Sequence, residues 1–290
     1  MSLSVIFALL LTPLIDGIVR NLRGKIQSRV GYPIFQTYYD LIKLSKRART
    51  APNTASWVFF FTPFLLFALA VILVLIANLT AFNDIILFIY ALAFFRFILG
   101  IESLESASPF AAVGASRESN VALYAEPIMI ISILVLCASN STTDIMQIRA
   151  NLLENGINSA SYILAAVAFV WAIYLELGRK PFDLAEAEQE IHEGVVAEFS
   201  GRDLAFLDFA LLLKQYAMMS LFVVLFVPFS FGNAVMDSVF VFVCVGIFYI
   251  LAIMMDNFGP RFKVLTSARF NAFLVLGVAL LALSFYVVGV

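Results

Sequence analysis

The densest cluster of acidic residues is GRKPFDLAEAEQEIHEGVVAEFSG, residues 178–201, which contains six carboxylates and the only histidine of the chain. Four of the carboxylates are spaced three, four and three residues apart, so a helix over 181–194 would align them on one face. Crowded, partly buried carboxylates retain protons more readily than isolated ones, and such a row can pass protons near neutral pH. A solvated acidic loop is the alternative. The four are Asp183, Glu186, Glu190 and Glu193.

The remaining polar groups of this stretch indicate no metal centre. Glu188 would face another side of the helix, Glu198 follows it, and His192 is an isolated histidine among glutamates without a recognisable ligand pattern. One histidine and two distant cysteines in apolar runs, Cys137 and Cys244, lack the ligand sets of iron–sulfur clusters and haem. We therefore expect no cofactor on this chain; in a redox system the electrons would travel elsewhere.

The composition is typical of an integral membrane protein. Hydrophobic residues make up 62% of the 290 residues and charged residues 13%, whereas a soluble domain is roughly half apolar and a quarter charged. A formal net charge of −2 gives no indication of nucleic acid. We expect an all-α fold forming a single polytopic membrane domain over residues 1–290.

About eight apolar runs are long enough to cross a bilayer as helices. Fifteen of the eighteen Lys and Arg residues lie in or beside the loops that follow odd-numbered runs. By the positive-inside rule these loops, including 21–56 and 179–207, are cytoplasmic, while the 139–158 loop and both termini lie outside. The runs are 3–20, 57–79, 84–101, 120–138, 159–178, 208–230, 235–256 and 270–289.

The first cytoplasmic loop contains an amphipathic pattern. In YPIFQTYYDLIKLSKR, apolar residues recur on one helical face and polar residues on the other, and Pro33 suits a first turn. This indicates an interfacial helix. It would contact anionic lipid or form the wall of a site between the membrane and cytoplasmic partners.

Carboxylates within or beside apolar runs are informative because a buried charge costs several kcal/mol unless it is paired, hydrated or protonated. Glu102 and Glu105 would share a helical face, and Glu126 lies inside its run just before a proline. Arg96 and Lys214 are plausible counter-charges. We expect Glu102, Glu105 and Glu126 to join the acidic stripe in a proton pathway. The other such acids are Asp16, Glu176, Asp208 and Asp256.

Three motifs resemble the membrane-protein family that includes the H subunit of NADH–quinone oxidoreductase and the membrane subunits of formate hydrogenlyase and other group 4 nickel–iron hydrogenases. The second is RVGYPIFQTYYDLIKL, where Tyr32 separates a Gly and a Pro that are usually adjacent. The third, SPFAAVGASRESNVALYAEP at 108–127, is similar to the hydrogenase branch. The first motif matches through Gly178, Pro181, Phe182, Asp183, Glu186, Glu188, Glu190, Glu198, Ser200 and Gly201.

The resemblance implies a subunit of a prokaryotic inner membrane that seats a hydrophilic redox arm on the membrane arm and couples it to proton or sodium movement. It implies hydrogenase large and small subunits, iron–sulfur subunits, antiporter-like membrane subunits and lipid as partners. The nickel–iron centre and the clusters would be held by those partners. The residues expected to dock them are Arg29, Gln36, Asp40, Lys43, Arg179 and Arg202.

Two other functions remain open. The chain could be the equivalent subunit of a quinone-reducing complex I, which residues 108–127 and the copurifying subunits would distinguish. It could also be a self-contained ion or solute transporter, although that class favours internal repeats with matching broken helices, which we do not find.

Overall fold

The computed structural model describes residues 2–53, 55–78, 82–106, 108–156, 159–185, 188–192 and 194–288. Within these ranges the chain is helical, and the only strand-like pairing is an isolated bridge between Asp84 and Asp144. The elements are α1 Ser2–Ile26, α2 Gln36–Ser45, α3 Trp57–Ala77, α4 Ile85–Glu105, α5 Pro109–Asn140, α6 Ile145–Asn155, α7 Ala160–Glu176, α8 Glu188–Ile191, a 3-10 turn Val196–Glu198, α9 Gly201–Phe226, α10 Ala234–Asp256, α11 Val264–Phe270, a π-helical turn Asn271–Val275 and α12 Leu276–Val288.

Local sequence determines where several of these helices begin. The side chains of Ser56, Asp84 and Asp144 each accept a hydrogen bond from the backbone N–H two residues later, at 3.2, 3.0 and 2.8 Å. These N-caps satisfy donors that the first helical turn leaves unpaired. Pro109 occupies the first turn of α5, where its missing N–H costs nothing.

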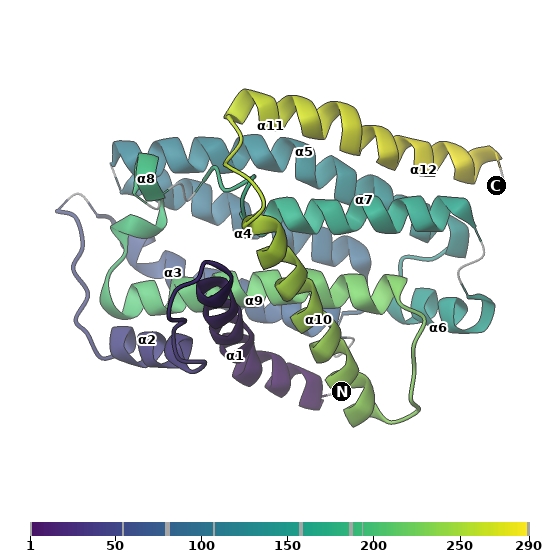
Figure 1. Cartoon of the computed structure of the whole chain (residues 1–290), viewed down its shortest axis with the longest axis horizontal. Coiled ribbons are helices and arrows are strands. Elements are labelled where there is room, and N and C mark those ends of the chain that lie inside the picture. Colours follow the sequence, from purple (N-terminus) through teal and green to yellow (C-terminus); the bar gives the residue numbers. More distant parts are fainter. Residues whose placement is uncertain are drawn as a thin grey trace.

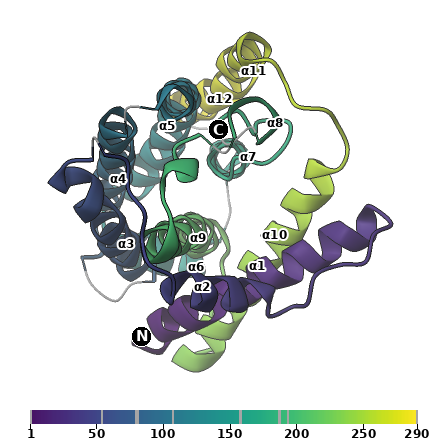
Figure 2. The ribbon, with the colours of Figure 1, turned by 90° about the vertical axis from the view of Figure 1, so that its left-hand side faces the viewer.

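The helices form one bundle around α9. In Figure 1, α5, α7, α9 and the α11–α12 segment run along the long axis, while α1 and α10 cross the bundle obliquely. The view along that axis shows α7 and α9 in the interior with α3, α4 and α5 to one side (Figure 2). Helix α9 packs against α1, α2, α3, α7 and α10. Three polar side chains of α9, Asp203, Lys214 and Ser220, are therefore buried inside the protein.

The expected membrane spans are confirmed in the described part of the chain. Seven helices there are long and apolar enough to cross a membrane, and α7 is a shorter apolar helix, so the expected number of eight is approximate. Two differences concern the fourth run and the loop after it. Helix α5 begins eleven residues before the expected start at 120, and the expected loop 139–158 contains α6.

The predicted helix over 181–194 is wrong. Among the described residues of this range only Glu188–Ile191 is helical, and His192 and Gly194 adopt positive φ angles of 49° and 60°. Tertiary contacts hold the first part in a non-helical form. Phe182 is buried edge-to-face against Trp171 and Phe262, and the backbone N–H of Phe262 donates to the carbonyl of Pro181.

The predicted amphipathic helix exists but starts later than Pro33, at Gln36. It lies against α1 and α9. The hydroxyl of its buried Thr37 donates a 2.8 Å hydrogen bond to Asp16 of α1. Ile34, Phe35 and Ile42 are exposed. A location at the membrane interface stays a prediction.

Candidate functional site

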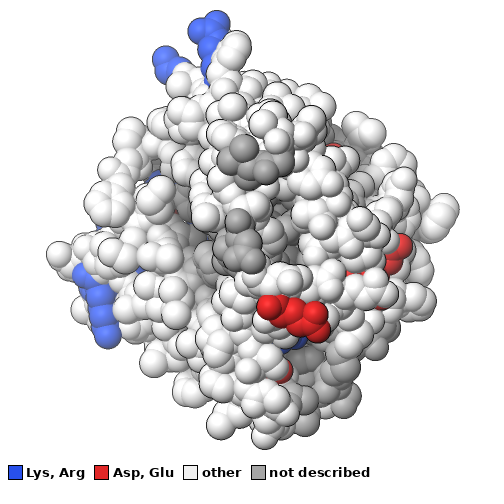
Figure 3. Space-filling model, turned by 90° about the vertical axis from the view of Figure 1, so that its right-hand side faces the viewer, with Lys and Arg blue, Asp and Glu red and all other residues white. Residues whose placement is uncertain are grey.

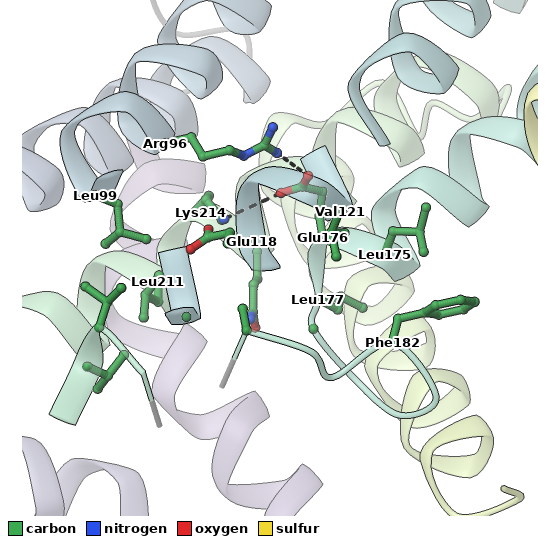
Figure 4. A pocket seen from close by; sticks show the side chains of 16 residues that line it. Arg96, Leu99, Glu118, Val121, Leu175, Glu176, Leu177, Phe182, Leu211 and Lys214 are labelled. Atoms are coloured by element: carbon green, nitrogen blue, oxygen red, sulfur yellow. Dashed lines mark hydrogen bonds and ion pairs between the residues drawn. The ribbon is translucent and has the colours of Figure 1, made fainter. Parts of the chain in front are cut away.

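A cavity of about 70 Å³ lies where α4, α5, α7 and α9 meet, and we call it the chamber. A water molecule needs roughly 10–15 Å³ of such volume, so the chamber has room for about five. Residues 178–201, called the acidic loop below, supply one wall. Figure 4 shows the charged side chains that converge there from the four helices. The lining residues are Arg96, Leu99, Gly114, Glu118, Val121, Leu175, Glu176, Leu177, Gly178, Phe182, Ala185, Val195, Val196, Leu211, Lys214 and Gln215.

Charged residues of the chamber wall form a chain of ion pairs that extends to Glu126, a partly exposed residue outside the lining. Arg96 of α4 forms ion pairs with Glu126 of α5 and with Glu176 of α7. The Nζ atom of Lys214, on α9, lies 3.5 Å from Oε2 of Glu176, and also 5.3 Å from the centre of the Phe95 ring. The side chains of Arg96, Glu176 and Lys214 are 10%, 5% and 5% exposed. Pairing on this scale makes ionised groups tolerable inside a membrane domain.

The acidic loop is held by arginines from two other elements. Arg117 of α5 donates to Oε2 of Glu190 at 2.7 Å, and Arg261, between α10 and α11, donates to Oδ2 of Asp183 at 2.8 Å. Arg261 also lies 3.7 Å from Oε1 of Glu190. The hydrogen bond from Arg117 holds the pKa of the Glu190 carboxyl below its usual range. Ion pairs therefore join the acidic loop both to α5 and to the segment between α10 and α11.

Close backbone packing presses the acidic loop onto α5. A Cβ atom at Gly114 would lie 2.9 Å from the Cα of Gly194 and 3.2 Å from the carbonyl oxygen of Ala185. Only glycine permits so close an approach. Because Gly114 and Ala185 both line the chamber, this contact forms part of the chamber wall on the loop side.

The predicted proton pathway is only partly assembled in the structure. Glu126 lies outside the chamber lining but forms an ion pair with Arg96 of the wall, and Asp183 and Glu190 are held on the loop by Arg261 and Arg117. Glu186 and Glu193 lie outside the described residues, as does the side chain of Glu188. None of the described acids of the predicted pathway is among the residues that line the chamber.

Glu102 belongs to a separate acidic group at the end of α4. Its side chain is completely buried, and neither carboxylate oxygen has a hydrogen-bond partner among the described residues. Glu198, in the 3-10 turn, is close enough to repel it electrostatically. Glu105 lies one turn further along α4 and is partly exposed.

The residues expected to dock partners divide into two sets. Arg29, Lys43 and Arg202 are exposed, and Arg179 is partly buried. Gln36 and Asp40 instead bond to one another at 2.9 Å. Asp40 also lies 3.6 Å from Arg20. These two side chains are engaged with their own chain.

Sequence reasoning missed Glu118 and the partners of the acidic loop. Glu118 follows Arg117 in the GASRE run that was assigned to the loop before the fourth span. The early start of α5 instead places it on the chamber wall (Figure 4). The signal available was the run itself, in which an arginine and a glutamate adjoin a membrane helix.

A metal-binding arrangement is not evident in the described part of the chain. No group of three or more His, Cys, Asp or Glu residues there could hold a metal ion. Glu176 of the chamber wall is paired with Arg96 and Lys214 instead.

Fold and site together define a polytopic all-α membrane protein with a chamber between its spans that is lined by charged residues and has room for a few water molecules. The chain belongs to the NADH dehydrogenase family, whose model matches residues 1–287. It is 43% identical over 233 residues to hydrogenase-4 component C of Escherichia coli, covering 78% of this chain and 74% of that protein. It is 34% identical over 234 residues to formate hydrogenlyase subunit 4 of the same organism, covering 78% and 76%.

More distant similarities extend to other respiratory complexes. The H subunit of NADH-quinone oxidoreductase from Geobacillus sp. is 28% identical over 228 residues, covering 71% of this chain and 66% of that protein. A chain in the structure of the membrane-bound sulfane sulfur reductase, an archaeal respiratory membrane complex, superimposes with a TM-score of 0.88 at 20% identity. The superposition covers 98% of this chain and 97% of the other, so the fold is shared along almost its whole length.

Proposed function

We propose that the chain is the membrane-anchoring and ion-coupling subunit of a group 4 membrane-bound nickel–iron hydrogenase of the formate hydrogenlyase type. The observation that carries this proposal is the chamber: ionised side chains from four helices surround a water-sized space beneath the acidic loop. The two E. coli relatives above, both named as parts of hydrogenase systems, support the hydrogenase branch. The lower identity to the Geobacillus relative makes the quinone-reducing complex the second candidate.

In this function, protons would cross between the acidic loop and the chamber. Glu190 and Asp183 lie on the loop beside two arginines, and Glu126 pairs with Arg96 of the chamber wall. Carboxylates joined by water exchange protons at useful rates when protonated and ionised forms are both accessible. The full proposed set is Glu102, Glu105, Glu126, Asp183, Glu186, Glu188, Glu190, Glu193 and Glu198.

The redox centres would belong to partner subunits docked on the cytoplasmic side. The exposed Arg29, Lys43 and Arg202 and the partly buried Arg179 offer positive charge to such a surface. A crosslinker placed near Arg202 should capture a hydrophilic subunit of the complex. Capture of membrane-embedded subunits alone would contradict the docking assignment.

The orientation of the chain is part of the same proposal. The face shown in Figure 3, where α6 and the end of α12 lie, carries only scattered charged side chains where it is described. This is what the positive-inside rule expects of the outer side. Cysteines at Asn53 and Asn155 should be labelled from opposite sides of the membrane, and labelling from one side would overturn the orientation.

The function itself is tested with Glu126→Gln in the intact complex. Glutamine keeps the shape and a hydrogen-bonding oxygen but removes the exchangeable charge beside Arg96. We expect normal subunit ratios and normal hydrogenase turnover under uncoupled conditions, with impaired redox-linked ion movement across vesicles. The matched control is Glu154→Gln, because Glu154 is exposed on α6. Full coupling in the Glu126 variant would remove this residue from the pathway, and absence of ion movement in the unmodified complex would refute ion coupling.

A further inference from the structure

The ionised groups of the chamber are unevenly matched. Two cations, Arg96 and Lys214, are paired with two carboxylates, Glu126 and Glu176. Glu118 is a third carboxylate, which lines the chamber whereas Glu126 does not, and no ion pair joins it to a described residue. Figure 4 shows it pointing into the same space as Lys214, with no interaction drawn between them. These five side chains together are thus neutral when Glu118 is protonated and carry one negative charge when it is ionised.

We propose that Glu118 is the group that takes up and releases the proton inside the chamber, an inference that rests on the ion-coupling function proposed above. Protonating Glu176 instead would deprive two nearby cations of a shared counter-charge, and protonating Glu126 would weaken its pair with Arg96. Breaking one partner of a buried pair is costly because the other charge is left uncompensated. Glu118 can change its charge without breaking an ion pair.

The backbone places Glu118 directly beneath the acidic loop. It lies one helical turn after Gly114, the residue against which Gly194 and Ala185 pack. Its neighbour Arg117 points the other way and donates to Glu190 and to the carbonyl oxygen of Leu184. Of these two consecutive residues of α5, Arg117 therefore binds Glu190 on the acidic loop, and Glu118 lines the chamber.

The transfer step involves only proton exchange. A hydrated proton entering from the loop side forms an O–H bond with one carboxylate oxygen of Glu118 and leaves a water molecule behind. The O–H bond then breaks toward a chamber water on the other side, which returns Glu118 to its ionised form. No electron is transferred, and Arg96 and Lys214 attract the ionised form electrostatically while it waits for the next proton.

The test is Glu118→Gln in the complete complex, reconstituted in sealed vesicles. We expect normal assembly and normal uncoupled hydrogenase turnover, with redox-driven proton movement slowed by about ten-fold or more, the scale of a lost proton-transfer group. Glu154→Gln again serves as the control. Proton movement at the unmodified rate in an assembled Glu118→Gln complex would overturn the inference while leaving the ion-coupling function intact. An unmodified complex that moves no protons would refute the function itself.

A second variant covers the case in which glutamine prevents assembly. Glu118→Asp keeps an ionisable group but withdraws it from the chamber by one methylene. We expect slower proton movement with uncoupled turnover unchanged, together with a shifted carboxylic-acid C=O stretching band in infrared spectra recorded on the same complex. A band and a rate identical to those of the unmodified complex would contradict a proton-carrying role, because a purely structural glutamate would move neither.

Discussion

The chamber and the acidic loop both pair arginine or lysine with carboxylates, but their surroundings differ. In the chamber, Glu176 is 5% exposed and is shared by Arg96 and Lys214. On the loop, Glu190 is 52% exposed and is shared by Arg117 and Arg261. The same chemistry therefore serves two purposes: the buried pairs join four helices around a polar space, and the more exposed pairs join the acidic loop to α5 and to the segment before α11.

The energetic contrast follows from solvent. Removing one partner of a buried pair costs about 3–5 kcal/mol because a bare charge remains in a poorly solvated place. An exposed pair is worth about 0–1 kcal/mol, since water and salt replace the lost partner. The predictions below test this contrast, from the largest expected effect to the smallest.

The largest effect is expected for Arg96→Gln. The variant leaves Glu126 without its cation and Glu176 with Lys214 alone, so we expect a loss of about 3–5 kcal/mol in the free energy of unfolding. Denaturation of the purified chain in detergent would measure it. Arg29→Gln, at an exposed side chain that no ion pair joins to a described residue, is the control and should change stability by less than about 1 kcal/mol. Equal stabilities for the two variants would mean that the ion pairs of Arg96 contribute no more to folding than an exposed charge does.

An intermediate effect is expected for Gly114→Ala. The added methyl would sit 2.9 Å from the Cα of Gly194, and relieving that clash should cost about 1–3 kcal/mol and lift the acidic loop. Faster amide hydrogen exchange within 178–201 would report the movement. Gly100→Ala is the matched control, because a Cβ there meets nothing within 4 Å and alanine favours the helix. Unchanged exchange in the Gly114 variant would show that the loop does not depend on this contact.

The smallest effect is expected for Arg117→Gln, and it should depend on pH. Arg117 lowers the pKa of Glu190, so the pair stabilises the fold above the unfolded carboxyl pKa, about 4.3, and this contribution disappears as the pH falls through the lower folded value. At neutral pH the variant should melt slightly below the unmodified chain, by a difference equivalent to about 1 kcal/mol or less. The two melting curves should converge in acid, and a constant difference at every pH would contradict the assignment.

The predictions from sequence that succeeded are those that depend on local properties of the chain. Apolar runs identify membrane spans because their length and composition are local properties, and every expected run overlaps an observed helix. Acids inside such runs could be recognised as functional candidates for the same reason. The expectation that Arg96 and Lys214 would act as counter-charges is confirmed by their ion pairs with Glu176.

The acidic loop shows where such reasoning fails. Its spacing fits a helix, but Phe182 gains more by inserting among aromatic rings from α7 and the segment before α11 than a local helix would provide. The partners Trp171 and Phe262 lie far away in sequence. No local pattern could have predicted them.

The sequence by itself determined an all-α membrane fold, its approximate spans, the resemblance to the family, and the acids that could carry protons. Only the tertiary structure decided which of these acids meet. It set Glu126 and Glu176 against Arg96, left Glu102 buried apart from them, and brought Glu118 to the chamber wall. The physical reason is that helix formation depends on neighbouring residues, whereas the pairing of charges depends on how helices distant in sequence pack in space.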